Sequence, residues 1–211
     1  ATAEGGENIV NTAMSAFGAN ALNQWRERRI DAVMHRTRNR PLPAGRLSAG
    51  DALTWGLVVS AAGPLILWLG VGLLPAALAI GANLLYVLVY TPLKRISTLN
   101  TAVGAVSGAL PPVIGWTAGG GGLDVGAALL FTLLFLWQMP HFFALAWLYR
   151  DDYARGGLRM LPVVDPRGRL TFPVTAVFAL LLLPLGLIGT LAGLAGFWFA
   201  LGSLGLGAWW A

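Results

Sequence analysis

Long apolar segments dominate the chain, and short polar stretches separate them. The first segment, at about 9–26, is only moderately apolar. Six more segments follow at roughly 52–71, 74–91, 100–118, 125–148, 172–191 and 194–211. Each approaches the ~20 residues that a helix needs to cross the hydrocarbon core of a bilayer. The sequence lacks the ~10-residue alternation of membrane-spanning β-strands. The pattern therefore predicts an all-α, polytopic bundle of transmembrane helices.

Basic residues gather between these segments in a way that predicts their orientation. All 14 Lys and Arg residues fall at 26–46, 94–95 and 150–169, and two apolar segments separate each stretch from the next. Cytoplasmic loops of membrane proteins carry such an excess of basic residues. We therefore expect the three stretches on the cytoplasmic side of the membrane. The opposite connections are short and nearly neutral, and Gly119 to Gly122 are expected to form a flexible turn.

Composition supports a membrane protein and excludes several chemistries. Hydrophobic residues make up 56% of the chain and charged residues 11%, whereas soluble domains carry ~25% charged residues. The net charge of +5 does not indicate nucleic acid as a partner, because the basic residues lie between spans, where they set orientation and meet anionic headgroups or phosphates. The sequence has no cysteine, which excludes disulfides, thiolate metal sites and cysteine nucleophiles. A single domain over 1–211 is the simplest organisation.

Asn23, Glu27 and Asp31 follow one another at four-residue spacing where the first segment ends. On a helix they share one face, with ~6 Å of axial rise between neighbours. Carboxylates at this spacing repel each other, and a cation between them would remove the repulsion. Oxygen ligands favour Mg²⁺, which bridges carboxylates to substrate phosphates. The alternative is that both acids simply pair with the arginines at 26–29.

Arg36 and Arg40 belong to one basic cluster, and Lys94 and Arg95 form a second on the same side. Both clusters suit an oxyanion-rich ligand such as a diphosphate, because arginine and lysine form charge-assisted hydrogen bonds with phosphate oxygens. The alternative is that these residues only set membrane orientation. With one further arginine, the residues expected to bind substrate are Arg36, Thr37, Arg40, Tyr90, Lys94, Arg95 and Arg150.

His141 lies within an apolar segment, directly after Pro140. Ionisable groups inside a span are costly and indicate function by default. A neutral histidine can ligate haem iron or carry a proton. The alternative is a hydrogen-bonded histidine that packs between helices.

Asp151 and Asp152 form a second acidic site on the charged side. If they face Glu27 and Asp31 across a cavity, they could hold a second Mg²⁺. The alternative is that they pair with Arg150 and Arg155.

At these residues the chain resembles the UbiA-type intramembrane prenyltransferase superfamily and, within it, the protohaem IX farnesyltransferase (haem O synthase) family. Asn23, Glu27 and Asp31 match the first acidic motif of the superfamily. The other matches run in order within about residues 18–165. They are Met34-x-Arg36-Thr37-x-x-Arg40-Pro41-Leu42, Tyr90 to Arg95, Pro111-Pro112-x-x-Gly115-Trp116, Met139-Pro140-His141-Phe142, Asp152-Tyr153 and Met160 to Val164.

The chain departs from the family pattern at three positions. Glu27 stands where many relatives have Asp, and Arg29 stands where many haem O synthases have Asp. Leu148 occupies the earlier position of the second acidic motif, which usually has two Asp. The family also has more spans than this chain shows. The resemblance therefore implies a fragment that lacks the first span and part or all of the last.

The resemblance implies a specific reaction. Farnesyl diphosphate loses diphosphate to give an allylic cation, a vinyl group of haem B attacks it, and water adds to give haem O. Catalytic roles are implied for Asn23, Glu27, Asp31 and His141, and Mg²⁺ as cofactor is implied to bind Glu27, Asp31, Asp151 and Asp152. The lipid bilayer, specifically a bacterial inner membrane, is the implied location. A functional link to haem A synthase and cytochrome oxidase assembly is also implied.

Two competing functions stay open on the sequence alone. Another UbiA-type prenyltransferase, acting on a quinone precursor or a chlorin, shares the acidic motif. A membrane transporter is a different class, but it would place charges near the bilayer midplane between broken helices. Here nearly all charges lie at one side, which disfavours a transporter.

Overall fold

The computed structural model describes residues 3–210, and within them the chain forms helices and no strands. The all-α prediction is confirmed. Residues 1–2 and 211, which belong to the predicted domain and its last segment, lie outside the described residues. The helices are α1 (Ala3–Asp31), α2 (Ala49–Gly70), α3 (Leu73–Leu84), η1 (Leu85–Tyr90), α4 (Thr91–Leu93), α5 (Asn100–Ala118), α6 (Val125–Leu148), α7 (Arg150–Arg155), α8 (Leu161–Val164), α9 (Thr171–Leu181), α10 (Leu183–Leu191) and α11 (Phe197–Trp210).

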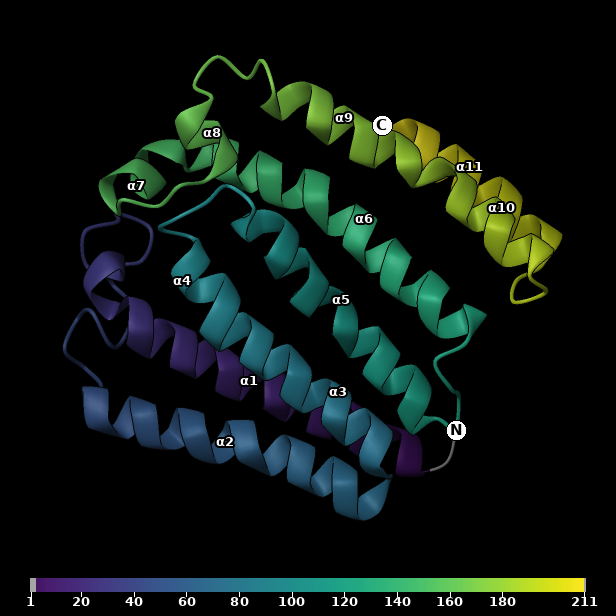
Figure 1. Ribbon diagram of the computed structural model, residues 1–211, viewed down its shortest axis with the longest axis horizontal. Coiled ribbons are helices and arrows are strands. Elements are labelled where there is room, and N and C mark those ends of the chain that lie inside the picture. Colours follow the sequence, from purple (N-terminus) through teal and green to yellow (C-terminus); the bar gives the residue numbers. More distant parts are fainter. Residues whose placement is uncertain (1–2, 211) are drawn as a thin grey trace.

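The long helices lie side by side in one row and run back and forth along a common direction (Figure 1). At one edge α2 packs against both α1 and α3, which overlap in this view, and α5, α6 and the group of α9, α10 and α11 follow. Three connections meet at one end of the row, namely the loop after α1, the turn after α4, and the segment that contains α7 and α8 (Figure 1). These connections, together with the last turns of α1, contain the three basic stretches. The prediction that they share one side of the molecule therefore agrees with the fold.

Within the described residues, four segments are long and apolar enough to cross a membrane, namely Ala49–Gly70, Leu73–Leu93, Val125–Leu148 and Thr171–Leu191. Large apolar side chains are exposed on them, as at Trp55, which is 65% exposed on α2. Apolar surface of this extent requires a lipid environment rather than water. The protein is therefore an integral membrane protein. The long helices α1 and α5 lie inside the row and carry more of the polar side chains.

A π-helical turn, η1, interrupts the span Leu73–Leu93 just before Pro92. Proline has no N–H to donate to the carbonyl four residues back. The Thr91 N–H donates to the carbonyl of Tyr86, five residues back, and this is the bonding pattern of a π-helix. Such turns occur often at functional sites. Here the turn carries Tyr86 and Tyr90, whose rings lie 5.1 Å apart between centroids.

Helices α1 and α2 approach each other closely at Gly18. A Cβ atom built on Gly18 would lie 2.3 Å from the backbone nitrogen of Ser60 and 2.6 Å from its Cα. Backbone atoms cannot move aside as the end of a flexible side chain can. Small residues allow this kind of close packing between membrane helices. A side chain at position 18 therefore forces α1 and α2 apart.

We expect Gly18→Leu to destabilise the protein by about 1–3 kcal/mol, because overpacking displaces the backbone of α2. Thermal unfolding in detergent, followed by size-exclusion chromatography, measures the effect. Gly81→Leu is the matched control, because a Cβ atom at Gly81 meets nothing within 4 Å. Equal losses in the two variants would contradict the close contact between α1 and α2.

Candidate active site

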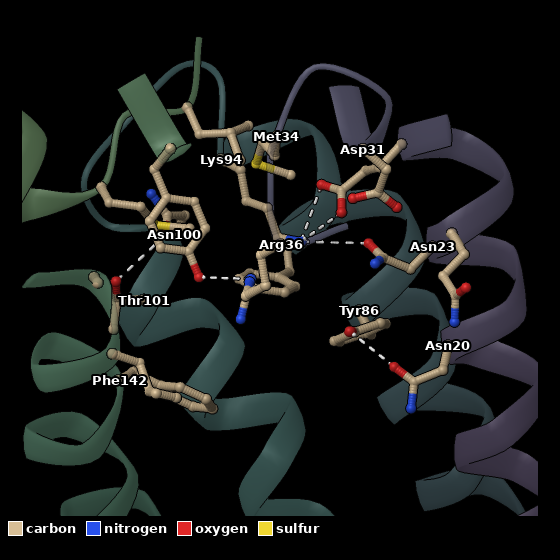
Figure 2. Close-up of a pocket in the computed structure, with 18 of the residues that line it drawn as sticks. Asn20, Asn23, Asp31, Met34, Arg36, Tyr86, Lys94, Asn100, Thr101 and Phe142 are labelled. Carbon is tan, nitrogen blue, oxygen red and sulfur yellow. Dashed lines mark hydrogen bonds and ion pairs between the residues drawn. The ribbon is translucent and has the colours of Figure 1, made fainter. Parts of the chain in front are cut away.

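A polar cavity of about 240 Å³ opens at the charged end of the bundle (Figure 2). Its walls come from α1, the loop after α1, η1, the turn after α4, α5, α6, α7 and the segment after α7. The lining residues are Asn20, Asn23, Gln24, Glu27, Asp31, Met34, Arg36, Arg40, Tyr86, Tyr90, Lys94, Asn100, Thr101, Phe142, Leu145, Ala146, Tyr153, Leu158 and Met160.

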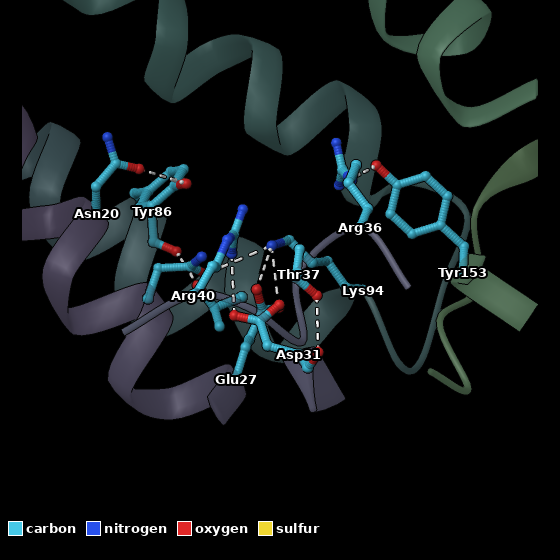
Figure 3. A network of polar contacts seen from close by, with 11 residues as sticks. Asn20, Glu27, Asp31, Arg36, Thr37, Arg40, Tyr86, Lys94 and Tyr153 are labelled. Carbon is cyan, nitrogen blue, oxygen red and sulfur yellow. Dashed lines mark hydrogen bonds and ion pairs between the residues drawn. The ribbon is translucent and has the colours of Figure 1, made fainter. Parts of the chain in front are cut away.

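Glu27 and Lys94 form a buried ion pair in this cavity (Figure 3). Lys94 Nζ lies 3.0 Å from Glu27 Oε1 and 2.9 Å from Oε2, and 3.4 Å from Asn23 Oδ1. The Lys94 ammonium also lies 4.5 Å from the centroid of the Tyr90 ring. Each side chain of the pair is less than a tenth exposed. Lys94 also lines the cavity, so an anion that enters the cavity can reach its ammonium group.

Asp31 is held one helical turn further on. It is 1% exposed, and its Oδ2 accepts a hydrogen bond of 3.0 Å from Arg40 Nη1. Thr37 Oγ1 donates to the backbone carbonyl of Asp31 over 2.9 Å, so this threonine supports the loop and does not line the cavity. Arg40 lies in the loop after α1 and reaches back across the end of that helix.

Glu27 and Asp31 therefore pair with cations, but not with those next to them in sequence. Arg26 donates to the Val87 carbonyl and Arg28 to the Trp25 carbonyl. Lys94 and Arg40 supply the positive charge instead. The alternative of simple pairing with the arginines at 26–29 does not hold among the described residues.

Arg36 reaches the cavity from the same loop. Its guanidinium lies 4.8 Å from the ring centroid of Tyr149 and 5.5 Å from that of Tyr153. Its Nη2 donates to the hydroxyl of Tyr153 over 3.1 Å (Figure 3). Aromatic faces attract such cations. Three basic side chains, Arg36, Arg40 and Lys94, thus line one small cavity.

Asp152 faces the loop after α1 and does not line the cavity. Its Oδ1 accepts the backbone N–H of His35 over 3.0 Å, and its Oδ2 accepts that of Arg36 over 3.1 Å. Arg155 forms an ion pair with the same carboxylate. Burial alone would raise the pKa of Asp152, but the hydrogen bonds from Arg155 and the two backbone groups outweigh it and lower the pKa to about 2. Asp152 is therefore ionised at neutral pH.

Several expected site residues lie away from the cavity lining. Arg95 is exposed, and Asp151 pairs with Arg150 at the surface, with 3.7 Å between Oδ1 and Nε. The alternative that Asp151 and Asp152 pair with Arg150 and Arg155 thus agrees with the structure. His141 is half-buried on α6 and stacks on Trp137, with 5.1 Å between the ring centroids.

Sequence reasoning missed part of the cavity wall. Tyr86 donates to Asn20 Oδ1 over 3.1 Å, and both line the cavity (Figure 2). Asn100 is fully buried and donates to the carbonyls of Ser97 and Arg159. The sequence carried a signal for two of these residues. Asn100 is a polar residue at the start of an apolar segment, and Asn20 lies about one helical turn before Asn23.

A second cavity, of about 230 Å³, shares four lining residues with the first and extends it into the bundle. The shared residues are Asn20, Tyr86, Tyr90 and Phe142. Small residues such as Gly104 and Gly108 line the deeper part. A polar chamber at the membrane face thus continues into a more apolar one.

The donor set of the first cavity fits a magnesium ion that arrives with a phosphate ligand. No three His, Cys, Asp or Glu side chains come together as metal ligands in the part of the chain that the structure describes. Glu27, Asp31 and the amide oxygen of Asn23 nevertheless line one cavity. Mg²⁺ usually takes one or two carboxylates and completes its shell with water and substrate phosphates.

An intramembrane helical bundle with an acidic and basic chamber at one face defines a class of membrane enzyme that acts on lipid-soluble substrates with polar head groups. The chain belongs to the UbiA prenyltransferase family, whose model matches residues 9–211. The prediction of a prenyltransferase is confirmed.

Similar proteins narrow the class further. The chain is 49% identical over 201 residues to the protoheme IX farnesyltransferase of Solibacter usitatus, covering 95% of this chain and 69% of the relative. It is 51% identical over 180 residues to that of an Anaeromyxobacter species, covering 85% and 60%. It is 44% identical over 192 residues to the mitochondrial one of Arabidopsis thaliana, covering 91% and 44%. The predicted resemblance to this family is confirmed, and the chain spans only part of these relatives.

The fold has a counterpart among solved structures. A UbiA homolog from Archaeoglobus fulgidus bound to DMAPP and Mg²⁺ superposes with a TM-score of 0.68 at 16% identity. The match covers 99% of this chain and 74% of that one. The similarity supports the same helical architecture.

We expect Lys94→Met to lower the free energy of unfolding by about 3 kcal/mol, because it leaves the buried Glu27 carboxylate without its cation. Chemical unfolding in detergent measures the loss. Arg150→Met is the comparison, since it breaks an exposed ion pair and should cost less than ~1 kcal/mol. Similar losses in both variants would show that Glu27 is solvated rather than dependent on Lys94.

Proposed function

We propose that the protein transfers a farnesyl group from farnesyl diphosphate to a vinyl group of haem B, with addition of water to the resulting cation, giving haem O and diphosphate. The observation that carries this proposal is the single cavity in which Glu27 and Asp31 lie with three cations. The names of the similar proteins support haem as the acceptor. This cavity lies where a diphosphate can enter from the membrane face while its prenyl tail stays in apolar surroundings.

Each lining residue has a role in this proposal. Arg36, Arg40 and Lys94 bind the diphosphate and neutralise the charge that develops as it leaves. Stabilisation of developing charge is usually the largest catalytic contribution. Glu27 and Asp31, supported by Asn23, hold Mg²⁺. Bound there, Mg²⁺ supplies further positive charge to the phosphate oxygens.

The prenyl tail needs an apolar path away from the polar chamber. The deeper cavity, which shares Tyr86 and Tyr90 with the chamber, supplies such a path between α1, α3 and α5. Gly104 and Gly108 let α5 pack closely against the wall of this path, because a Cβ atom at Gly104 would meet the Tyr90 ring and one at Gly108 the Gln138 amide. We propose that the first isoprene units lie there.

We also propose that the charged end faces the cytoplasm of a bacterium and that the bilayer is its inner membrane. The basic residues at that end support this orientation. A functional link to haem A synthase and cytochrome oxidase assembly follows from haem O as the proposed product.

Glu27→Gln and Asp31→Asn should each lower the rate of haem O formation by at least ~100-fold, because each removes a carboxylate charge from the proposed diphosphate site. Haem O is measured by chromatography after membranes with the full-length protein are incubated with haem B, farnesyl diphosphate and Mg²⁺. Asp51→Asn is the control, since Asp51 is an exposed acid on the same face.

Near-normal haem O formation in both variants would remove the metal-binding assignment. Incubation with 4-hydroxybenzoate instead of haem B tests the alternative acceptor. Prenylation of that ring without haem O formation would identify a different prenyltransferase. Binding of both substrates without diphosphate release would indicate a carrier.

His141→Ala tests whether His141 contacts haem. If this residue ligates the iron, the variant should shift the Soret band of the haem-loaded full-length protein. If it carries a proton, the rate should fall while the spectrum stays unchanged. His141→Gln is the matched variant, because it keeps a polar side chain of similar size beside Trp137. An unchanged spectrum and rate in both variants would reduce the role of His141 to packing on Trp137.

A further inference from the structure

The loop after α1 carries two of the three cations of the polar cavity, and its anchoring decides where they lie. Arg40 is fixed through its own side chain by Asp31. Arg36 lies in an exposed part of the loop. What holds its backbone is the carboxylate of Asp152, more than a hundred positions later in the chain.

Asp152 uses both carboxylate oxygens for this purpose. Oδ1 accepts the N–H of His35 and Oδ2 accepts the N–H of Arg36, so the carboxylate spans two consecutive backbone groups. Arg155 pairs with Oδ1 from the next turn of α7. The residue is 7% exposed. Such charge-assisted hydrogen bonds are roughly twice as strong as neutral ones, and the carboxylate therefore ties this part of the loop to α7.

The surroundings of Asp152 hold the same stretch of loop from other directions. Tyr153, the next residue, accepts a hydrogen bond from the Arg36 side chain at its hydroxyl, and Tyr149 lies under the guanidinium. At the far end of α7, a Cβ atom built on Gly156 would lie 2.9 Å from Ile30 Cγ2 and 3.2 Å from Met34 Sδ. One short segment, 149–156, therefore fixes both the backbone and the side chain of Arg36.

We propose that Asp152 is a positioning residue that sets Arg36 against the substrate diphosphate, and that it is not a magnesium ligand in this protein. The inference rests on the proposed function. Asp152 points at the loop rather than into the cavity that Glu27 and Asp31 line. Asp152 therefore affects the reaction by fixing the position of Arg36.

Substitution of a metal ligand and substitution of a positioning residue should have different effects on binding. Removal of a metal ligand weakens Mg²⁺ binding first, whereas displacement of Arg36 weakens binding of the diphosphate and leaves the metal dependence unchanged. Asn at position 152 replaces one acceptor oxygen by an N–H₂ group, which cannot accept from a backbone N–H. Asp152→Glu keeps the charge and both oxygens but lengthens the side chain, so it shifts the loop without removing a possible ligand.

The experiment measures binding of inorganic pyrophosphate to the purified full-length protein by calorimetry at saturating Mg²⁺, and counts bound Mn²⁺ by electron paramagnetic resonance. Asp152→Asn and Asp152→Glu should each weaken pyrophosphate binding about 10-fold and leave the Mn²⁺ count and affinity unchanged. Arg36→Gln should weaken pyrophosphate binding to a similar degree. The double variant Asp152→Asn with Arg36→Gln should bind no more weakly than Arg36→Gln alone, because the two residues act as one unit. Asp51→Asn is the control and should match the unmodified protein.

Loss of a Mn²⁺ ion in Asp152→Asn, or losses that add in the double variant, would overturn the proposal. Unchanged pyrophosphate binding in both Asp152 variants would overturn it as well. If Asp152→Asn does not fold, Asp152→Glu decides: unchanged pyrophosphate binding in that variant, or losses that add when it is combined with Arg36→Gln, would overturn the proposal. Failure of the unmodified protein to bind pyrophosphate with Mg²⁺ would instead overturn the proposed function, so the two failures are distinguishable.

Discussion

The buried ion pair between Glu27 and Lys94 is the interaction on which the candidate site depends. A carboxylate at this depth is stable only with a partner, because desolvation of a lone charge is very costly. Lys94 comes from the turn after α4, so the pair joins α1 to a segment far away in sequence. The same pair keeps both charges next to a cavity that a diphosphate can enter. The carboxylate of Glu27 and the ammonium of Lys94 therefore neutralise each other in the fold and also take part in the proposed chemistry.

The need to keep the charged site away from lipid is consistent with which helices lie inside the row. Helices whose residues supply the polar wall, α1 and α5, lie inside the row, and strongly apolar α2 covers the outer side of α1 (Figure 1). In a bilayer the outer helices meet lipid, which accepts exposed apolar side chains such as Trp68. The moderate apolarity of the first segment is thus a property of an inner helix. Gly18 lets α1 approach α2 closely enough to fill that place.

Much of this architecture could be predicted from the sequence, because apolar segments of this length and the distribution of basic residues are direct consequences of the bilayer. The helices at 100–118 and 125–148 have the bounds that the pattern predicts. Predicted segment 172–191 is divided at Leu182, where Pro184 cannot donate to the carbonyl four residues back. The extension of α1 to Asp31 was not predicted by apolarity, because its last turns are polar and stabilised by contacts with other segments.

The site could be predicted in composition but not in pairing. Glu27, Asp31, Arg36, Arg40 and Lys94 were expected together and lie together. Their partners depend on which loops meet, and spacing along one helix carries no information on that. Asp152 is the clearest case, because its hydrogen bonds go to backbone groups of His35 and Arg36, which leave no trace in a residue pattern. Whether Asp151 and His141 take part in the reaction stays a prediction.

The rim of the polar chamber also forms a closed circuit. From α1, the ion pair of Glu27 leads to Lys94, whose carbonyl accepts the N–H of Arg159 over 2.7 Å. The chain then runs back from Arg159 to Asp152, which binds the loop that returns to α1. Loosening one member of such a circuit relaxes the geometry of the others. The energetic contributions of Glu27, Lys94, Arg159 and Asp152 are therefore shared, and the rim responds to a perturbation as one cooperative unit.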